Sequence, residues 1–168
     1  MTQRLNAFSA APEGFDALLA VERYLAASWL DRRLIALVNT RVSQMNGCVY
    51  CLHMHTQEAR ELGESEARLY LLDAWRESAL YSDRERAALG WAESLTNIAT
   101  THAPDDVYRR ARCHFSEKEL TDLSIAIAMI NGWNRLAIAA RSLHPSERTQ
   151  AASRNGEASA ARAAAPSR

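Results

Sequence analysis

The chain has 168 residues and a formal net charge of zero at pH 7, with 20 Lys plus Arg balanced by 20 Asp plus Glu. This length suits a single domain with its own hydrophobic core, and the balanced charge gives no reason to expect nucleic acid or an anionic membrane as a partner. The first residues lack the apolar region of a signal peptide, and no apolar run approaches the ~20 residues of a membrane span. We therefore expect a cytoplasmic protein.

Apolar residues recur at helical spacing along most of the chain, and no segment alternates like a strand between hairpin turns, so we predict an all-α fold. A first helix follows Pro12. Asp31 is a suitable N-cap for a second helix, which should end at Asn46-Gly47 because glycine favours the left-handed conformation after a helix. A third helix is predicted from about Cys48 to Leu62, before Gly63.

Capping residues also mark the later helices. Ser65 can cap a fourth helix. Ser82 and Ser116 each begin a Ser-x-x-Glu pattern, which is typical of a capping box. They open a fifth helix and a long apolar last helix that reaches about Leu143. Between these two, Pro104 suits the first turn of a sixth helix.

The helices should form one domain over residues 1–145. Their apolar faces are broad enough to bury surface between subunits as well, so we expect a homo-oligomer. From 146 to 168 the chain is dominated by Ala, Ser and Arg and has little that could pack against a core. We predict that this segment is a flexible tail.

The chemically informative segment is Gly47-Cys48-Val49-Tyr50-Cys51-Leu52-His53-Met54-His55. If Cys48 lies in the first turn of the third helix, Cys51 at i+3 and His55 at i+7 share one face of that helix. Unpaired N–H groups of the first turn and the helix dipole favour a thiolate, and His55 can accept a thiol proton. Such surroundings lower a cysteine pKa from about 8.5 toward neutrality. The pattern predicts a pair of redox-active thiols.

Three other interpretations of this segment are possible. A c-type haem site needs His directly after the second cysteine, where the chain has Leu52. A zinc site could use both cysteines with His53 or His55, but the only further ligand pair, Cys113-His114, stands alone. The cysteines could also be small core residues. The redox pair is favoured, and no metal or cofactor is predicted.

The run Arg41-x-Ser43-Gln44-x-Asn46-Gly47-Cys48-x-Tyr50-Cys51-x-x-Met54-His55 resembles the AhpD-like alkylhydroperoxidases of the carboxymuconolactone decarboxylase superfamily. The similarity covers roughly residues 5–145. It implies an all-helical fold that assembles into homo-trimers or homo-hexamers. It also implies reduction of organic hydroperoxides, or related thiol–disulfide chemistry, with a thiol, a dithiol or a protein disulfide partner as reductant.

The resemblance also implies a role for each site residue. Cys51 would become the sulfenic acid, Cys48 would donate the proton and resolve the intermediate as a Cys48–Cys51 disulfide, and His55 would be the base. The position of Cys48 at the helix start favours it as the more exposed and more reactive sulfur, whereas the proximity of His55 favours Cys51. These two arguments do not settle the order of the cysteines. We follow the resemblance, because a base in contact is more specific than a shared dipole.

One position departs from the family pattern. Members commonly carry a Glu, acting as a proton relay, twelve positions before the first cysteine, and this position is Ala36 here. Glu22 is a candidate substitute; otherwise the relay runs through water, or peroxidase activity is weak. General acid–base catalysis typically increases the reaction rate by about 10²–10⁴-fold.

The expected function is therefore that of a thiol-dependent peroxidase. Two alternatives stay open from the sequence. One is a helical oligomer that senses redox state or binds a metal without peroxidase turnover, and the other is an enzyme of the lactone decarboxylase type.

Overall fold

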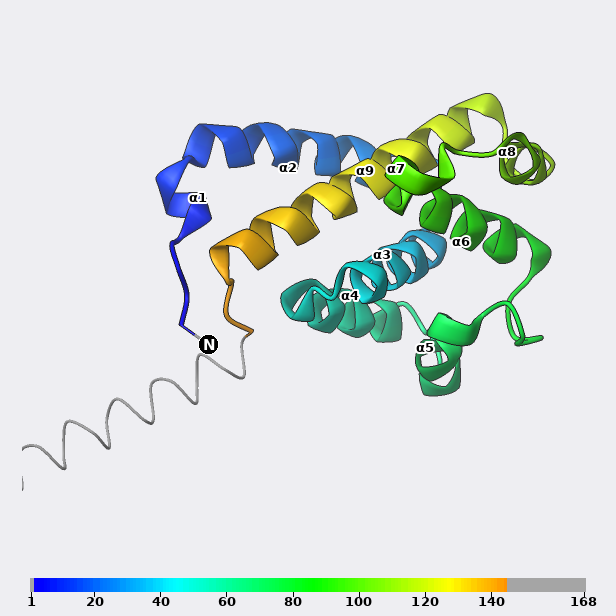
Figure 1. Ribbon diagram of the computed structural model, residues 1–168, viewed down its shortest axis with the longest axis horizontal. Helices are drawn as coiled ribbons and strands as arrows, with labels where there is room; N and C mark the ends of the chain where they lie inside the picture. Colours follow the sequence, from blue (N-terminus) through cyan, green and yellow to red (C-terminus); the bar gives the residue numbers. More distant parts are fainter. Residues whose placement is uncertain (1, 145–168) are drawn as a thin grey trace, which may run out of the picture.

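The structure is a computed structural model that describes residues 2–144, so the predicted tail and residues 1 and 145 of the predicted domain lie outside the described residues. Within this range every regular element is a helix, which confirms the predicted all-α fold (Figure 1). In chain order the elements are α1 (Ala7–Ala10), α2 (Pro12–Ala26), α3 (Arg32–Asn46), α4 (Val49–Glu61), α5 (Glu66–Leu71), the 3₁₀ turn η1 (Leu72–Ala74), α6 (Asp83–Thr96), α7 (Ile98–Thr101), α8 (Asp105–Arg112) and α9 (Glu117–Ala140).

Local capping interactions begin and end several of these helices where the sequence predicts. The Asp31 side chain accepts a hydrogen bond from the Arg33 N–H at the start of α3, at 2.8 Å. Gly47 ends α3 with a φ of +68°. Ser82 and Ser116 each form a complete capping box, at the starts of α6 and α9. Because these contacts join residues two or three apart, sequence spacing is enough to find them.

Two helix boundaries differ from the sequence prediction. Pro104 is the N-cap of α8 and not part of its first turn. The last helix ends at Ala140 rather than near Leu143, since Arg141 takes a left-handed conformation with a φ of +51°. The Arg4 N–H donates to the Ala140 carbonyl at 3.0 Å. The N-terminal segment thus satisfies a free carbonyl at the end of the last helix, a long-range contact that no local pattern contains.

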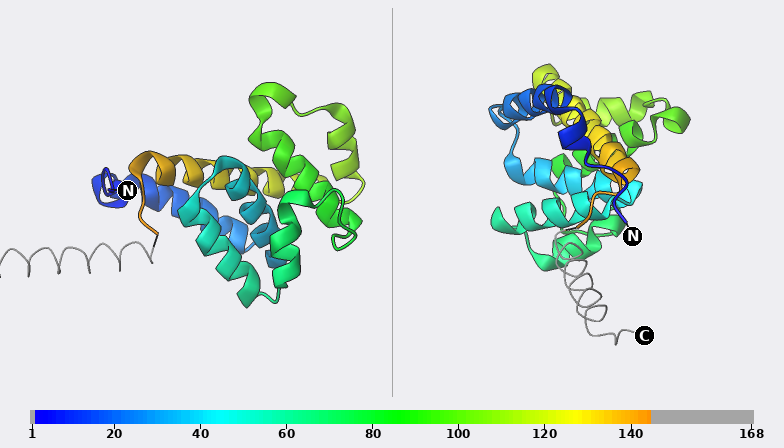
Figure 2. Two further views of the ribbon diagram at one scale, coloured as in Figure 1. Left: turned by 60° about the horizontal axis from the view of Figure 1, so that its bottom comes forward. Right: turned by 90° about the vertical axis from the view of Figure 1, so that its left-hand side faces the viewer.

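The central helix of the fold is α9, which packs against α2, α3, α4, α6 and α8 (Figures 1 and 2). Its Leu123, Ile127 and Ile130 are at most 2% exposed. By length and composition alone α9 could cross a membrane, with a mean hydropathy of 1.3, so the expectation that no apolar run reaches this length was wrong. In the structure α9 packs against five other helices, and 33% of its most apolar stretch is buried.

Helices α1 and α2 form an N-terminal arm that lies along α9 (Figures 1 and 2). No residue of α2 is buried. Phe15 of α2 contacts Phe8 of α1 and Trp133 of α9, with ring centroids 5.3 Å and 5.6 Å apart. The arm lines an open cavity of about 1020 Å³ together with α3, α4 and α9. The cysteine motif lies at this cavity.

Candidate active site

A two-residue connection between α3 and α4 positions the cysteine motif. Gly47 adopts its positive φ after the last turn of α3, and the Cys48 N–H donates to the Ser43 carbonyl at 3.1 Å. The chain then enters α4 at once, with Cys48 as the N-cap rather than in the first turn as predicted. A left-handed residue followed by a backward N–H bond is the usual glycine ending of a helix. Glycine is needed here because other residues are strained at this φ.

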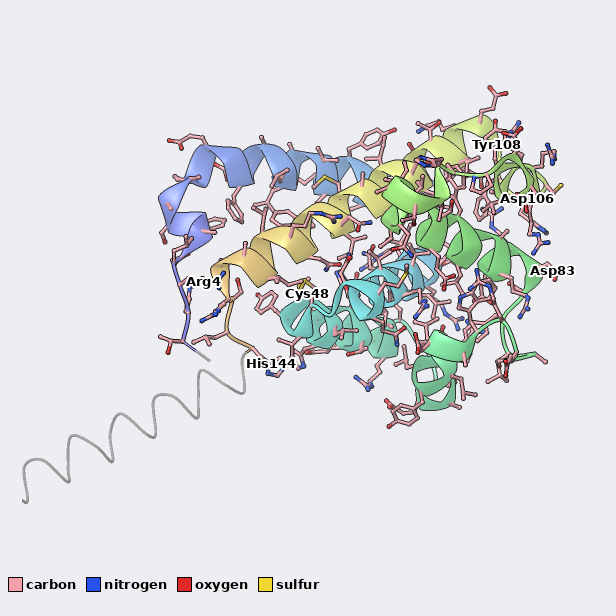
Figure 3. All side chains as sticks on the ribbon, viewed as in Figure 1. Arg4, Cys48, Asp83, Asp106, Tyr108 and His144 are labelled. Carbon is pink, nitrogen blue, oxygen red and sulfur yellow. A yellow bond between two sulfur atoms is a disulfide. The ribbon has the colours of Figure 1, made fainter. Side chains whose placement is uncertain are left out.

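Cys48 and Cys51 are joined by a disulfide, with their Cα atoms 5.4 Å apart. The Cys48 sulfur also accepts a hydrogen bond from the Cys51 N–H at 3.3 Å. Free N–H groups at a helix start stabilise a partial or full negative charge on the atom that they contact. The predicted contact between this sulfur and a first-turn N–H is therefore present. Figure 3 labels Cys48 where α4 begins, beside α9.

The two sulfurs differ in their access to the cavity. Cys48 is 1% exposed and Cys51 is 2% exposed, and both pack in the main hydrophobic core. Of the two, only Cys51 lies in the cavity wall. The expectation that Cys48 is the more exposed sulfur was wrong, because α3 and α9 cover the N-cap position.

His55 lies one turn after Cys51 on α4 and also borders the cavity. It is 7% exposed. Its Nδ1 is 3.1 Å from Oε2 of Glu58, again one turn further along the helix. An ionised carboxylate can only accept, so this contact places the proton on Nδ1 and leaves Nε2 as the basic nitrogen.

Glu58 is held in its ionised form. The hydrogen bond with His55 lowers the pKa of the Glu58 carboxyl, burial opposes this, and the charges of His55 and Arg32 lower it further. Arg32 and Glu58 both lie in the cavity wall. Glu58 is not among the site residues predicted from the sequence, although its i+3 spacing from His55 indicates such a contact.

The two positions considered for a proton relay have other surroundings. Ala36 is 1% exposed and packs in an apolar cluster with Ala59 and Leu69. Glu22 does border the cavity, but its carboxylate accepts a hydrogen bond from Trp133 Nε1 at 2.6 Å. Among the described residues, the carboxylate in contact with His55 is that of Glu58.

A buried polar network fixes the connection that carries Cys48. The Asn46 Nδ2 donates to Asn134 Oδ1 at 2.8 Å and to Asn131 Oδ1 at 3.0 Å, both on α9. The Asn134 Nδ2 donates to the Ser43 hydroxyl at 3.1 Å. Buried and satisfied networks of this kind specify one arrangement of the packed helices. They hold the end of α3 against α9.

The other residues considered for a metal site lie apart from the cysteine pair. His53 is not part of the cavity wall, and its ring contacts that of His144 edge to face, with ring centroids 4.1 Å apart. Cys113 is a free, exposed cysteine at the end of α8. Within residues 2–144, no three His, Cys, Asp or Glu side chains converge in a way that could hold a metal.

Comparison with known proteins places the chain in a family. The model of the carboxymuconolactone decarboxylase family matches residues 10–94. An uncharacterized protein of Bacillus subtilis, YdfG, is 44% identical over 139 residues, which cover 83% of this chain and 95% of the relative.

Two solved structures share the fold. ATU0492 from Agrobacterium tumefaciens, described as a protein of unknown function and a candidate AhpD antioxidant defence protein, is 45% identical with a TM-score of 0.83, covering 86% of this chain and 99% of its own. An uncharacterized peroxidase-related protein from Silicibacter sp. TM1040 is 25% identical with a TM-score of 0.71, covering 80% of this chain and 72% of its own. With the helical fold and the cysteine pair, these matches show that the chain belongs to the carboxymuconolactone decarboxylase family and is AhpD-like.

Proposed function

We propose that the protein is a thiol-dependent peroxidase that reduces organic hydroperoxides, with Cys51 as nucleophile, Cys48 as resolving cysteine and His55 as base. The observation that carries the proposal is the shared cavity wall of Cys51 and His55, one helical turn apart, with Cys48 disulfide-bonded behind it. A nucleophile and its base must face the same substrate space, and a resolving cysteine must reach the nucleophile. The antioxidant and peroxidase-related descriptions of the similar structures agree with this chemistry.

The reaction begins from the reduced pair. His55 Nε2 accepts the Cys51 thiol proton, and the thiolate attacks the terminal oxygen of the hydroperoxide. The O–O bond breaks, Cys51 is oxidised to sulfenic acid, and the alkoxide takes the proton from His55 and leaves as an alcohol. The Cys48 thiol then attacks the Cys51 sulfur, which releases water and forms the disulfide. An external dithiol reduces the disulfide to two thiols and is itself oxidised.

Glu58 serves this scheme as a positioning residue. Its hydrogen bond to Nδ1 leaves Nε2 as the nitrogen that can accept a proton and stabilises the imidazolium that forms when His55 holds the proton. A carboxylate plays the same part behind the histidine in other nucleophilic enzymes. In this proposal Glu58 supports the histidine. Ala36, at the position where family members commonly carry the relay Glu, has only a methyl group and cannot do so.

The proposal extends to the partners of the protein. The reductant is a small or protein-borne thiol or dithiol, the chain assembles as a homo-trimer or homo-hexamer, and the reaction takes place in the cytoplasm. The broad apolar faces of the helices and the AhpD-like fold support the oligomer.

The test is consumption of cumene hydroperoxide by the reduced, metal-free protein with dithiothreitol as donor. We expect turnover in the wild type and none in Cys51→Ser. Cys48→Ser, reduced and then freed of dithiothreitol, should consume one equivalent of hydroperoxide and accumulate a sulfenic acid that dimedone traps. Full turnover in Cys51→Ser would contradict the proposed order of the cysteines.

The same protein preparations separate the alternatives. A Cys48–Cys51 disulfide that forms in the wild type without hydroperoxide turnover would support a redox-sensing role. Stoichiometric zinc in protein purified without chelator, lost in Cys48→Ser, would support a metal-binding role.

A further inference from the structure

The backbone of Cys48 is fixed by hydrogen bonds to two helices. Its N–H donates to the Ser43 carbonyl at 3.1 Å, in the last turn of α3, and its carbonyl accepts from the Leu52 N–H at 2.9 Å, in α4. Its sulfur accepts from the Cys51 N–H at 3.3 Å. The position of Cys48 relative to Cys51 therefore depends on where α3 ends, and not on α4 alone.

Asn134 of α9 is hydrogen-bonded to two residues of the last turn of α3. Its Nδ2 donates to the Ser43 hydroxyl at 3.1 Å, and its Oδ1 accepts from the Asn46 Nδ2 at 2.8 Å. The Asn46 Nδ2 also donates to the Asn131 Oδ1 at 3.0 Å. Asn134 and Ser43 are both 0% exposed. The residue whose carbonyl holds Cys48 is thus itself held by Asn134, where α4 begins beside α9 (Figure 3).

These amide contacts are directional, unlike the apolar packing next to them. Ile127 and Ile130 of α9 lie in the main core, but a core of this kind keeps most of its stability when its packing becomes less specific. Hydrogen bonds weaken steeply when their distance or angle changes, and a buried amide that loses its partner is destabilising. The bonds of Asn134 therefore define one position for the end of α3.

We propose that Asn134 is a positioning residue that keeps Cys48 within reach of Cys51 when the disulfide is open. In the oxidised protein a covalent bond joins the two sulfurs. In the reduced protein only noncovalent contacts keep them together, and those of Asn134 act on Cys48 through Ser43. A group that is held close to its reaction partner has a high effective concentration, which falls when the group moves more freely.

This role concerns the resolving step, and there it rests on the proposed peroxidase function. In that step the Cys48 thiol attacks the Cys51 sulfenic acid: the S–S bond forms, the S–O bond breaks, and the hydroxyl group leaves as water with the thiol proton. The earlier attack of Cys51 on the hydroperoxide does not use Cys48. Loss of the Asn134 contacts should therefore slow resolution and not the first step. The effect on the disulfide equilibrium needs no hydroperoxide.

The disulfide equilibrium is measured in glutathione buffers, by alkylation of free thiols and mass spectrometry of the peptide that carries both cysteines. Asn134→Leu keeps a similar volume and removes both hydrogen bonds. Its equilibrium constant for forming the disulfide should fall about 10-fold, which raises the reduction potential by about 30 mV. Asn46→Ala removes the network from a half-buried position and should shift the potential in the same direction. It decides the question if Asn134→Leu does not fold.

Tyr24→Phe is the matched control. It also removes a hydrogen bond to α9, from the Tyr24 hydroxyl to Asp122 Oδ1 at 2.6 Å, but this bond joins α9 to α2 and not to α3. Tyr24 lies outside the cavity wall. The substitution should leave the reduction potential unchanged, even where urea unfolding shows a loss of stability.

A single-turnover experiment tests the resolving step. Reduced protein freed of dithiothreitol is mixed with one equivalent of cumene hydroperoxide. In Asn134→Leu the hydroperoxide should disappear at the wild-type rate, whereas the disulfide should form about 10-fold more slowly and dimedone should label Cys51.

A wild-type potential in every folded variant of Asn134 and Asn46, or an equal shift in Tyr24→Phe, would overturn the role of Asn134. Equal slowing of hydroperoxide loss and disulfide formation would overturn its effect on resolution. If the wild-type protein does not react with hydroperoxide, the proposed peroxidase function fails, and the potentials alone decide whether Asn134 positions Cys48.

Discussion

His55 and Glu58 lie one turn apart on α4, with Nδ1 of the histidine 3.1 Å from Oε2 of the glutamate. The histidine side chain is 9% exposed and that of the glutamate is 38% exposed, so the pair spans the cavity wall from the core side to a more solvated side. The contact selects the Nδ1–H tautomer and thereby determines which nitrogen can take a proton from Cys51.

Replacement of Glu58 by Gln should slow the reaction with hydroperoxide. A neutral amide no longer stabilises the imidazolium, so kcat/KM should fall roughly 10- to 100-fold, below the ~10²–10⁴-fold typical of losing general acid–base catalysis altogether. The pH at which activity reaches half its maximum should also shift, which a purely structural role would not cause. Stopped-flow kinetics between pH 5 and 9 measures both quantities.

The matched control for Glu58→Gln is Glu61→Gln. Glu61 lies on the same helix, is exposed, and accepts a hydrogen bond from Gln57 at 3.0 Å. Its replacement should change neither kcat/KM nor the pH profile. Equal effects of the two substitutions would show that Glu58 acts through the helix and not through His55.

Substitution of Gly47 by Ala should destabilise the protein by about 1–2 kcal/mol, because a side chain at a φ of +68° is strained. An added Cβ meets no heavy atom within 4 Å, so the cost is that of the backbone and not of a clash. Gly47→Asn should cost less, since asparagine tolerates this conformation better. Urea unfolding of the three proteins measures the order, and an asparagine variant less stable than the alanine variant would contradict this account.

Glu93 should matter more for stability than an exposed glutamate. It accepts hydrogen bonds from Arg41 Nε at 2.7 Å and Trp75 Nε1 at 2.8 Å, with only 12% of its side chain exposed. Burial raises the pKa of its carboxyl, but the hydrogen bonds from Trp75, Arg76 and Arg41 outweigh this and lower it. Glu93→Gln should reduce the free energy of unfolding by about 1.5–3 kcal/mol. The control is Glu66→Gln. Glu66 forms an exposed ion pair with Arg60, so this substitution should leave the free energy of unfolding unchanged.

The capping box of α9 should make stability depend on pH in the acid range. The Ser116 N–H donates to Glu119 Oε2 at 2.8 Å, and this bond, with one from Arg84, lowers the pKa of the Glu119 carboxyl to about 2. A carboxyl with a depressed pKa stabilises the folded state above its unfolded pKa, and this contribution is lost as pH falls from about 4.5 to about 2.

Glu119→Gln should therefore lower the melting temperature at pH 7, and its difference from the wild type should shrink toward pH 2. Thermal unfolding followed by circular dichroism measures the difference. Glu117→Gln is the control, since that side chain is 89% exposed and lies in the same first turn. A difference between Glu119→Gln and the wild type that stays constant with pH would contradict the assignment.

The fold class and several helix ends could be predicted from the sequence because they depend on neighbours in the chain. Ser82 and Ser116 meet glutamates three residues away, and Gly47 needs only its own backbone freedom. The Cys48–Cys51–His55 pattern likewise depends on helical spacing alone. These are local interactions, and local spacing is what a sequence displays directly.

Tertiary packing decided which groups face the substrate space. The N-terminal arm contacts α9 through Glu22 and Trp133, which are 111 residues apart in the chain. Glu22 was the candidate proton relay to His55, but its carboxylate accepts a hydrogen bond from Trp133 instead. The same packing buries Cys48, leaves Cys51 in the cavity wall, and leaves the Asn39 Oδ1 without a hydrogen bond from any residue that the structure describes. Helical periodicity places a residue on one side of its own helix. Whether that side meets a core, a cavity or another charge depends on residues far away in the chain.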